Sequence, residues 1–474
     1  MRPQEPAQPA RHTEPEHAAG HSEPAQPPGH TEPVPPTRHT GPVPTLRPAH
    51  HARHKGLQGL TVRRGALALA AVPPLAAGVL WAMTSGPASG APEPAPGAPA
   101  AAGPPAPALA GSPRLYTPLA NPDAYKQALR LSQGGAAAGL REAAGIIRMV
   151  RTPHAVWYGD QSPAAVEKDA RAVARDAAID GSMPVFALYN IPGRDCSNYS
   201  GGGASNTAEY KAWIDGVARG IGKRDALVVL EPDSLALVPS DCGQDDAQGT
   251  KTAARYEEVN YAVSTFAALR HTRVYLDTGH AGWHDTASIV PRLVKGGITS
   301  ATGFYTNASN HQTDEANSWY GKLISSCLAY VEAGGKAADC PSQKGPRAAA
   351  QAWLDKNVTT PPSRMKHFVT DTSRNGTGPW KPPAGKYTDP QDWCNPPGRG
   401  LGVPPTTRTG DPLHDAKLWI KTPGESDGLC LRGTPGPKDP ERDTVDPKAG
   451  DWFPEQAVEL LRLANPPLLP GRPE

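Results

Sequence analysis

The feature that most constrains this chain is a regular alternation of apolar runs and amphipathic helical patterns between residues 154 and 464. Strands are predicted at 154–159, 183–193, 226–233, 272–280, 301–310, 367–373 and 417–428, and helices at 163–181, 207–222, 254–270, 286–297 and 453–464. Because the strands are apolar throughout and helices separate them, the pattern predicts a parallel sheet covered on both faces. No glycine-rich phosphate loop follows any strand, so an α/β barrel fits better than a doubly wound sheet.

Acidic residues follow the carboxyl ends of most of these predicted strands: Asp160, Asp195, Glu231, Asp233, Asp277, Asp371, Glu425 and Asp427. In a parallel barrel these ends share one face, where active sites are built. Trp157, Trp283 and Trp393 lie close to the acids in the sequence. Indole faces stack on pyranose rings, and carboxylates bind hydroxyls and transfer protons. A single acid of this kind usually caps the next helix, so it is the repetition that predicts a sugar-binding site.

The balance of charges and the cysteine content limit the class of protein. The chain has 48 Lys and Arg residues against 46 Asp and Glu residues, which gives no basic surface for nucleic acid. Its six cysteines include no CxxC pair and no Cys/His spacing typical of a zinc site. We expect no nucleic-acid partner, no metal and no cofactor. An even cysteine count favours three disulfides in an oxidising compartment, with six reduced cysteines as the alternative.

The amino-terminal quarter differs in composition from the rest. Residues 1–62 are rich in Pro and His and are expected to be a disordered tail. Residues 63–84 begin with Arg63-Arg64 and continue as an uncharged apolar span, which predicts a signal-anchor or a removable export signal. Residues 85–114 form an Ala/Pro/Gly linker, and residues 115–474 the folded catalytic domain. We therefore expect a secreted protein or one anchored facing outwards, with the membrane touched only by the apolar span.

Two longer segments also carry a family resemblance. "YNIPGRDCSNYSGGG" (189–203) and "VVLEPDSLAL" (228–237) resemble the two signature segments of glycoside hydrolase family 6, which comprises cellulases and cellobiohydrolases. "YLDTGHAGWH", "TNASN", "DTSRNGTGP", "DWCNPPGRGLG" and "LWIKTPGESDG" resemble later blocks of that family in the same order, over residues 115–468. The resemblance implies a distorted, incomplete (β/α) barrel with a central parallel sheet. It also implies inverting hydrolysis of β-1,4-glucan.

The resemblance further assigns roles to individual residues. Asp233 would be the general acid, and Asp195 would raise its pKa by like-charge repulsion. Asp427 would be the base, and Tyr189 would crowd the sugar at the cleavage point. Residues matching the glucose subsites are Trp157, Trp283, Trp393, His280, Asn310, Lys421 and Glu425. Arg194 and Asp277 would set the charge on Asp195 and order the ring of acids.

The same alignment implies the disulfides Cys196–Cys242 and Cys394–Cys430, which leaves Cys327–Cys340 by parity. The short stretch Gly428-Leu429-Cys430 leaves little room for a loop over the cleft, unless the Pro- and Asp-rich residues 431–452 fold over it. We therefore expect an open cleft and a monomeric endo-acting enzyme on cellulose or a related β-glucan. Two alternatives are an exo-acting cellobiohydrolase of the same family and a catalytically silent, wall-tethered glucan-binding protein.

Overall fold

The structure, a computed structural model, describes residue 109 and residues 111–197 and 200–470. The expected tail, the apolar span and most of the linker lie outside these residues. Within them, no helix is both long enough and apolar enough to cross a bilayer.

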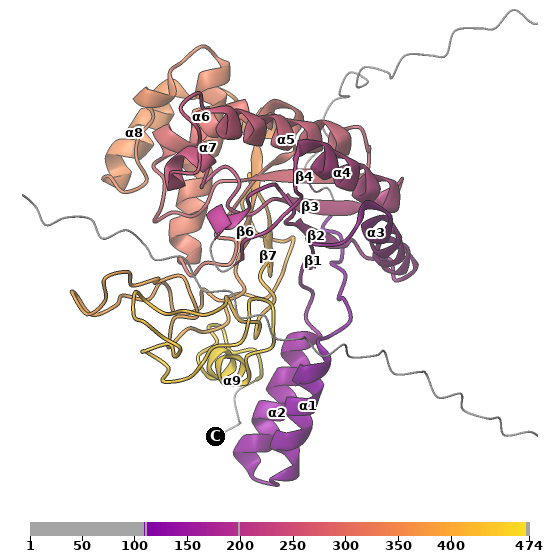
Figure 1. Ribbon diagram of the computed structural model, residues 1–474. Helices are drawn as coiled ribbons and strands as arrows, with labels where there is room; N and C mark the ends of the chain where they lie inside the picture. Colours follow the sequence, from indigo (N-terminus) through magenta and orange to yellow (C-terminus); the bar gives the residue numbers. More distant parts are fainter. Residues whose placement is uncertain (1–108, 110, 198–199, 471–474) are drawn as a thin grey trace, which may run out of the picture. The chain divides into compact units, whose positions relative to one another are not determined.

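Seven parallel strands form one sheet in chain order (Figure 1). They are β1 (Val156–Tyr158), β2 (Val185–Leu188), β3 (Ala226–Leu230), β4 (Thr272–Asp277), β5 (Gly303–Thr306), β6 (His367–Asp371) and β7 (His414–Leu418). Each strand pairs with the next, and among the described residues no pairing joins β7 back to β1. The prediction of an incomplete barrel with a central parallel sheet is therefore confirmed.

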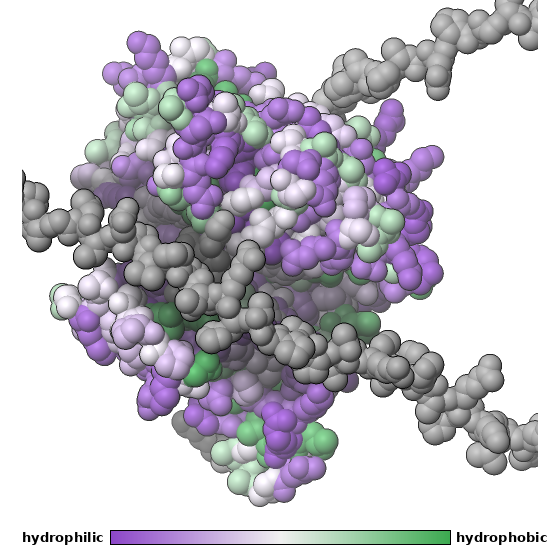
Figure 2. All heavy atoms as spheres, in the orientation of Figure 1, coloured by the Kyte–Doolittle hydropathy of each residue, from purple (hydrophilic) through white to green (hydrophobic). Residues whose placement is uncertain are grey.

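Helices follow most strands and cover the outer side of the sheet. They are α3 (Pro163–Ile179), α4 (Thr207–Ile221), α5 (Thr250–Ala267), α6 (Thr286–Lys295), α7 (Asp314–Glu332) and α8 (Arg347–Asn357). Helix α4 illustrates why they form: Asn206 caps its first turn by accepting the Glu209 N–H (2.9 Å), and its buried face recurs at helical spacing. Figure 2 shows hydrophilic side chains over the outer surface of α3–α5, as expected for helices with one solvated face.

Alternate residues of each strand point to two separate cores. Phe186 and Leu188 of β2 pack outwards against the helices, whereas Val185 and Ala187 point into the barrel. A third core joins the two ends of the domain, because α1 (Pro122–Gln133) and α2 (Ala137–Val150) pack against α9 (Pro454–Arg462). Figure 1 shows α1, α2 and α9 together, away from helices α3–α7.

The predicted elements differ from the structure in two ways: most predicted strands extend past their observed carboxyl ends, and four helices were not predicted. The strand expected over 417–428 ends at Leu418 in β7, so the remaining residues form a loop. The reason is that the Asp371 carboxylate accepts the N–H groups of Ile420 (3.2 Å) and Lys421 (2.9 Å) in place of a neighbouring strand. In addition, helices α1, α2, α7 and α8 were not among the predicted elements.

Candidate active site

A cavity of about 850 Å³ lies at the carboxyl ends of the strands, between the loops that follow them. All of the residues proposed from the sequence for catalysis, sugar binding and support line it: Trp157, Tyr189, Arg194, Asp195, Asp233, Asp277, His280, Trp283, Asn310, Trp393, Lys421, Glu425 and Asp427. The sheet topology thus brings together side chains that are far apart in the sequence.

Asp233 reaches the cavity through a tight turn after β3. Both Glu231 (φ +48°) and Asp233 (φ +67°) have left-handed backbone conformations, which residues other than glycine seldom adopt. Glu231 is fully buried, and its Oε2 accepts the N–H groups of Asn190 (2.8 Å) and Ile191 (3.0 Å) after β2. The Glu231 carboxyl therefore holds the turn to the neighbouring strand, while Asp233 faces the cavity.

The surroundings of Asp233 favour its protonated form. Burial raises the pKa of Asp233 well above its usual value, and the Asp277 and Asp195 carboxylates raise it further, in that order. Asp277 is itself fixed beneath the turn: its Oδ2 accepts the Leu235 (3.2 Å) and Ala236 (2.8 Å) N–H groups. Asp277, expected as a supporting residue, thus contributes to the raised pKa of Asp233 together with Asp195, to which the family resemblance assigned that effect.

Asp195 lies on the loop after β2, and several hydrogen bonds and a disulfide fix this loop. Its Oδ2 accepts the Ser200 N–H (2.9 Å), and Cys196 is bonded to Cys242 (S–S 2.08 Å). Arg194 donates to the Tyr189 carbonyl (2.6 Å) and the Ser200 carbonyl (2.8 Å). This disulfide ties the Asp195 loop to the segment that follows Asp233.

Asp427 has the opposite electrostatic environment. Its Oδ2 accepts hydrogen bonds from Arg374 (2.7 Å) and the Asn395 N–H (2.9 Å), and Lys421 Nζ lies 3.4 Å from Oδ1. Burial alone would raise the pKa of Asp427, but Arg374 and Lys421 outweigh burial and lower it to about 2. Asp427 is therefore held as an anion, and it faces the same cavity as Asp233, whose surroundings favour the protonated form.

Aromatic side chains line the β1 and β2 side of the cavity. Trp157 donates its Nε1–H to the Ile420 carbonyl (2.8 Å), which fixes the indole across the gap between β1 and β7. The Tyr189 ring meets the Trp157 ring edge to face at 5.7 Å. Trp393, on the loop between β6 and β7, is 37% exposed, so its indole is accessible from the solvent.

The β4 and β5 side combines an aromatic pair with neutral polar groups. Trp283 lies 5.7 Å from the His280 ring and 5.1 Å from the His284 ring. Burial, followed by the His284 and Lys344 charges, lowers the pKa of His280 to about 4. His280 is therefore a neutral hydrogen-bonding group near neutral pH. Asn310 accepts the His311 N–H (2.8 Å) and completes this wall.

Lys421 and Glu425 lie on the loop between β7 and α9. Lys421 Nζ donates to the Ser426 carbonyl (2.9 Å) besides its contact with Asp427. Burial raises the pKa of Glu425, and the nearby Lys421 charge opposes this rise. The pair thus presents a cationic donor and a carboxyl group to the cavity side by side.

Two further charged residues shape the site. Arg374, only 1% exposed, pairs with Asp427, and Asp371 is a buried acceptor that shapes the Lys421 loop. Asp371 is the last residue of β6 and Arg374 follows it, so both lie where the strand-end pattern located the other acids. Asp371 was noted on that basis, but nothing in the sequence pairs Arg374 with Asp427.

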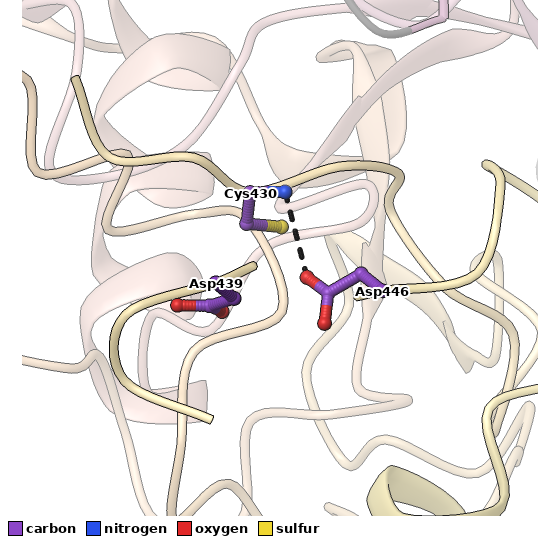
Figure 3. Close-up of side chains that lie close together, drawn as sticks. All are labelled: Cys430, Asp439 and Asp446. Carbon is purple, nitrogen blue, oxygen red and sulfur yellow. Dashed lines mark hydrogen bonds between the residues drawn. The ribbon is translucent and has the colours of Figure 1, made fainter. Parts of the chain in front are cut away.

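All six cysteines form disulfides: Cys196–Cys242, Cys327–Cys340 and Cys394–Cys430, the same pairs that were expected. Near the last of them, Cys430, Asp439 and Asp446 lie close together (Figure 3). The Cys430 sulfur is used in its disulfide, and Asp439 forms a two-point ion pair with Arg432 (2.8 and 2.9 Å). This cluster therefore holds the loop together and has no free set of metal ligands.

Comparison with known proteins places this geometry in a family. A family model for glycosyl hydrolases family 6 matches residues 113–464. Endoglucanase A of Cellulomonas fimi is 35% identical over 319 residues, which cover 67% of this chain and 56% of that protein. A probable 1,4-beta-D-glucan cellobiohydrolase C of Aspergillus fumigatus is 33% identical over 305 residues, covering 60% of this chain and 62% of that protein. The chain thus matches little more than half the length of these curated relatives.

A solved structure extends the likeness to the fold. The endoglucanase Cel6 from Mycobacterium tuberculosis, in complex with methyl-cellobiosyl-4-deoxy-4-thio-β-D-cellobioside, is 32% identical with a TM-score of 0.55. The match covers 75% of this chain and 98% of that chain.

Proposed function

The chain belongs to glycosyl hydrolase family 6, and we propose that it hydrolyses β-1,4-glucosidic bonds in cellulose or a related β-glucan with inversion. One observation carries the proposal: a carboxyl group kept protonated and a carboxylate kept ionised face one cavity lined with indole rings. Glycoside hydrolysis needs this pair of states, because the leaving oxygen must gain a proton while a water loses one.

In this mechanism Asp233 donates its proton to the glycosidic oxygen. The burial of Asp233 and the charges of Asp277 and Asp195 keep the proton available near neutral pH. Asp427 receives the proton of the attacking water. Because the pKa of Asp427 is only about 2, we propose that it acts late, as charge develops on the sugar, and through intervening water.

The remaining cavity residues bind and shape the glucan. Trp157, Trp283 and Trp393 offer indole faces for stacking on glucose rings. Tyr189, in edge-to-face contact with Trp157, crowds the sugar at the cleavage point. Arg194 holds the Tyr189 carbonyl and so supports this placement.

We further propose internal cleavage by a monomeric catalytic domain. The relatives include proteins named endoglucanase and others named cellobiohydrolase, so names alone do not decide between the two modes. Internal cleavage is favoured by the short Gly428-Leu429-Cys430 connection after Asp427, while of the segment that follows only Lys448, Ala449 and Gly450 line the cavity among the described residues. Three disulfides favour a location outside the cytoplasm, to which residues 63–84 would direct or tether the chain.

Substitution of the acid tests the proposal. Asp233→Ala is expected to abolish release of soluble sugar from carboxymethylcellulose or β-glucan, with retained binding of cello-oligosaccharides. A matched control is Asp225→Ala, which removes an exposed carboxylate just before the other end of the same strand. Unchanged sugar release by Asp233→Ala would refute the assignment. A wild type that binds glucan but releases nothing would instead favour a glucan-binding protein.

Product analysis tests the stereochemistry and the mode of attack. Inversion predicts that α-anomers appear first when NMR follows hydrolysis of cello-oligosaccharides. Internal cleavage predicts a fast fall in viscosity of carboxymethylcellulose per reducing end released. A slow fall in viscosity, with cellobiose as the main product, would support end-directed attack.

A further inference from the structure

Asn395 makes a reciprocal contact with the proposed base. It lies in the loop between β6 and β7, is fully buried, and has a left-handed backbone conformation (φ +36°). Its main-chain N–H donates to Asp427 Oδ2 (2.9 Å), and its side-chain Oδ1 accepts the Asp427 main-chain N–H (2.8 Å). Asn395 therefore holds both the carboxylate and the backbone of Asp427.

Both polar atoms of the Asn395 side-chain amide form hydrogen bonds with buried groups. Its Nδ2 donates to Ser426 Oγ (3.0 Å), the Gly428 carbonyl (3.1 Å) and Asp446 Oδ2 (3.0 Å). Its Oδ1 also accepts the Gln456 Nε2–H (3.0 Å) from α9. Because a carbonyl and a carboxylate can only accept, the amide has one orientation in this pocket. The disulfide between Cys394 and Cys430 closes the loop next to it.

We propose that Asn395 is a positioning residue for Asp427, and that Asp446 acts on the reaction only by holding the Asn395 amide. This inference rests on the proposed role of Asp427 as the base. A neutral amide is required at this position, because its oxygen must accept the Asp427 main-chain N–H while its nitrogen donates to the Asp446 carboxylate. An aspartate of the same shape would add a negative charge there and lose the donor group.

The charges around this network have a clear arrangement. Arg374 and Lys421 face the Asp427 carboxylate, and the neutral His311 lies within range of both Arg374 and Asp427. On the far side of the amide, Asp439 and Arg442 surround Asp446, and the Arg442 Nε–H donates to the Asn395 carbonyl (2.8 Å). A new carboxylate at 395 would oppose the effect of Arg374 and Lys421, and would raise the pKa of Asp427.

The test compares Asn395→Asp, Asn395→Ala, Asp446→Ala and the double variant Asn395→Ala/Asp446→Ala. We expect kcat to fall on the order of 10²-fold in both Asn395 variants with a much smaller change in KM, because a displaced base affects the chemical step more than binding. In Asn395→Asp the acidic limb of the kcat/KM profile is expected to move upwards by about one pH unit. The double variant is expected to be no worse than Asn395→Ala alone.

A control at a half-buried asparagine separates these effects from the loss of an amide donor alone. Asn260 of α5 donates from its amide to the Tyr256 (2.7 Å) and Lys295 (2.5 Å) carbonyls, away from the cavity. Asn260→Asp loses a donor in the same way and should leave the pH profile unchanged. Thermal unfolding of each variant identifies any that fails to fold. If the Asn395 variants do not fold, Asp446→Ala serves as the test, with an expected fall in kcat smaller than the roughly 10²-fold fall expected for the Asn395 variants.

Three results would overturn the inference: an unshifted acidic limb in folded Asn395→Asp, equal changes in kcat and KM, or additive losses in the double variant. A readout that does not need activity is the pKa of the Asp427 carboxyl, followed by NMR in wild type and Asn395→Asp. If the wild type releases no sugar but this pKa still rises in the variant, the proposed function fails while the positioning role stands.

Discussion

Single residues of this site hold conformations that their own side chains do not favour. Asp195, Glu231, Asp233 and Asn395 all have positive φ, which costs roughly 1 kcal/mol or more for each residue with a side chain. Neighbouring groups offset this cost. Glu231 accepts two N–H groups from the chain after β2, and Asn395 uses every polar atom of its amide. The acids are therefore placed by buried polar contacts that span distant parts of the sequence.

Asp277 should control the protonation of Asp233 more strongly than Asp195 does. Removing a nearby negative charge lowers the pKa of Asp233, so the acid form, and with it activity, is lost at a lower pH. We expect Asp277→Asn to shift the alkaline limb of the kcat/KM profile downwards further than Asp195→Asn. Profiles recorded for both variants check this order. An alkaline limb that moves only in Asp195→Asn would show that Asp195 is the dominant charge.

Glu231 should make the stability of the fold depend on pH. Burial raises its pKa from 4.5 to about 8. Because the carboxyl group has a higher pKa in the folded state than in the unfolded state, its contribution to stability is fully present below the pKa of the unfolded state. This contribution is lost as the pH rises through the pKa of the folded state. We expect the free energy of unfolding of the wild type to fall by up to about 5 kcal/mol across this window relative to Glu231→Gln. Urea unfolding at several pH values measures the difference, and parallel curves would contradict it.

At the scale of elements, the strands were easier to predict than the helices. Apolar runs such as the one that becomes β3 are buried on both faces and are visible in the sequence. Helix α2 was missed although its buried Ile146, Met149 and Val150 recur at helical spacing, because its first residues are as rich in Ala and Gly as the linker before α1. Helix α7 buries Asn317 and Ser325, whose partners are the Gln312 and Lys366 carbonyls. Such pairings depend on the fold and have no pattern along the sequence.

The same distinction explains which site residues were found. Acids at strand ends follow from the parallel sheet, and the family resemblance supplied their roles. Arg374 and Asn395 act through contacts with Asp427, more than 30 residues away in the sequence, and only the folded chain reveals these contacts. The strand predicted through residue 428 was wrong because the acceptor that ends it, Asp371, comes from another strand.

The packing of α7 on β6 depends on a glycine. A Cβ added at Gly321 would lie 2.6 Å from the Phe368 ring, which is stacked between Phe304 and His414. Helix propensity alone favours Gly321→Ala by about 1 kcal/mol, whereas overpacking costs about 1–3 kcal/mol. We expect a net loss of stability, measured as a lower Tm. Ser318→Ala on the same helix serves as the control, and a higher Tm in Gly321→Ala would show that the ring moves aside.

At the scale of the whole molecule, the two ends of the catalytic domain support each other and the site. Gln127 of α1 accepts the Trp452 Nε1–H (2.7 Å), and its amide donates to the Pro454 carbonyl (2.9 Å) at the start of α9. Trp452 in turn forms an isolated bridge with Glu425, two residues before Asp427. The hairpin of α1 and α2 therefore supports the loop that carries the proposed base, and Asn121, which caps α1, also forms a side-chain hydrogen bond with Glu425 of the cavity.

This arrangement predicts where the chain can be shortened. We propose that residues 109–474 fold and hydrolyse glucan without the preceding segments, because Arg114 and Tyr116 still pair with Met183 beside β2. A chain of residues 152–474 lacks α1 and α2 and would expose Trp452 and Leu460, which are now buried. We expect it to unfold at a lower temperature and to lose most of its kcat, as judged by thermal unfolding and sugar release from β-glucan.

A point variant separates support of the loop from general loss of the core. Gln127→Leu keeps the apolar packing of α1 but removes both hydrogen bonds to the Trp452–Pro454 segment. If the hairpin acts on the site through this segment, Gln127→Leu should lower kcat by several-fold while its Tm stays near that of residues 109–474. An unchanged kcat in Gln127→Leu, together with an active 152–474 chain, would mean that the Asp427 loop does not depend on the hairpin.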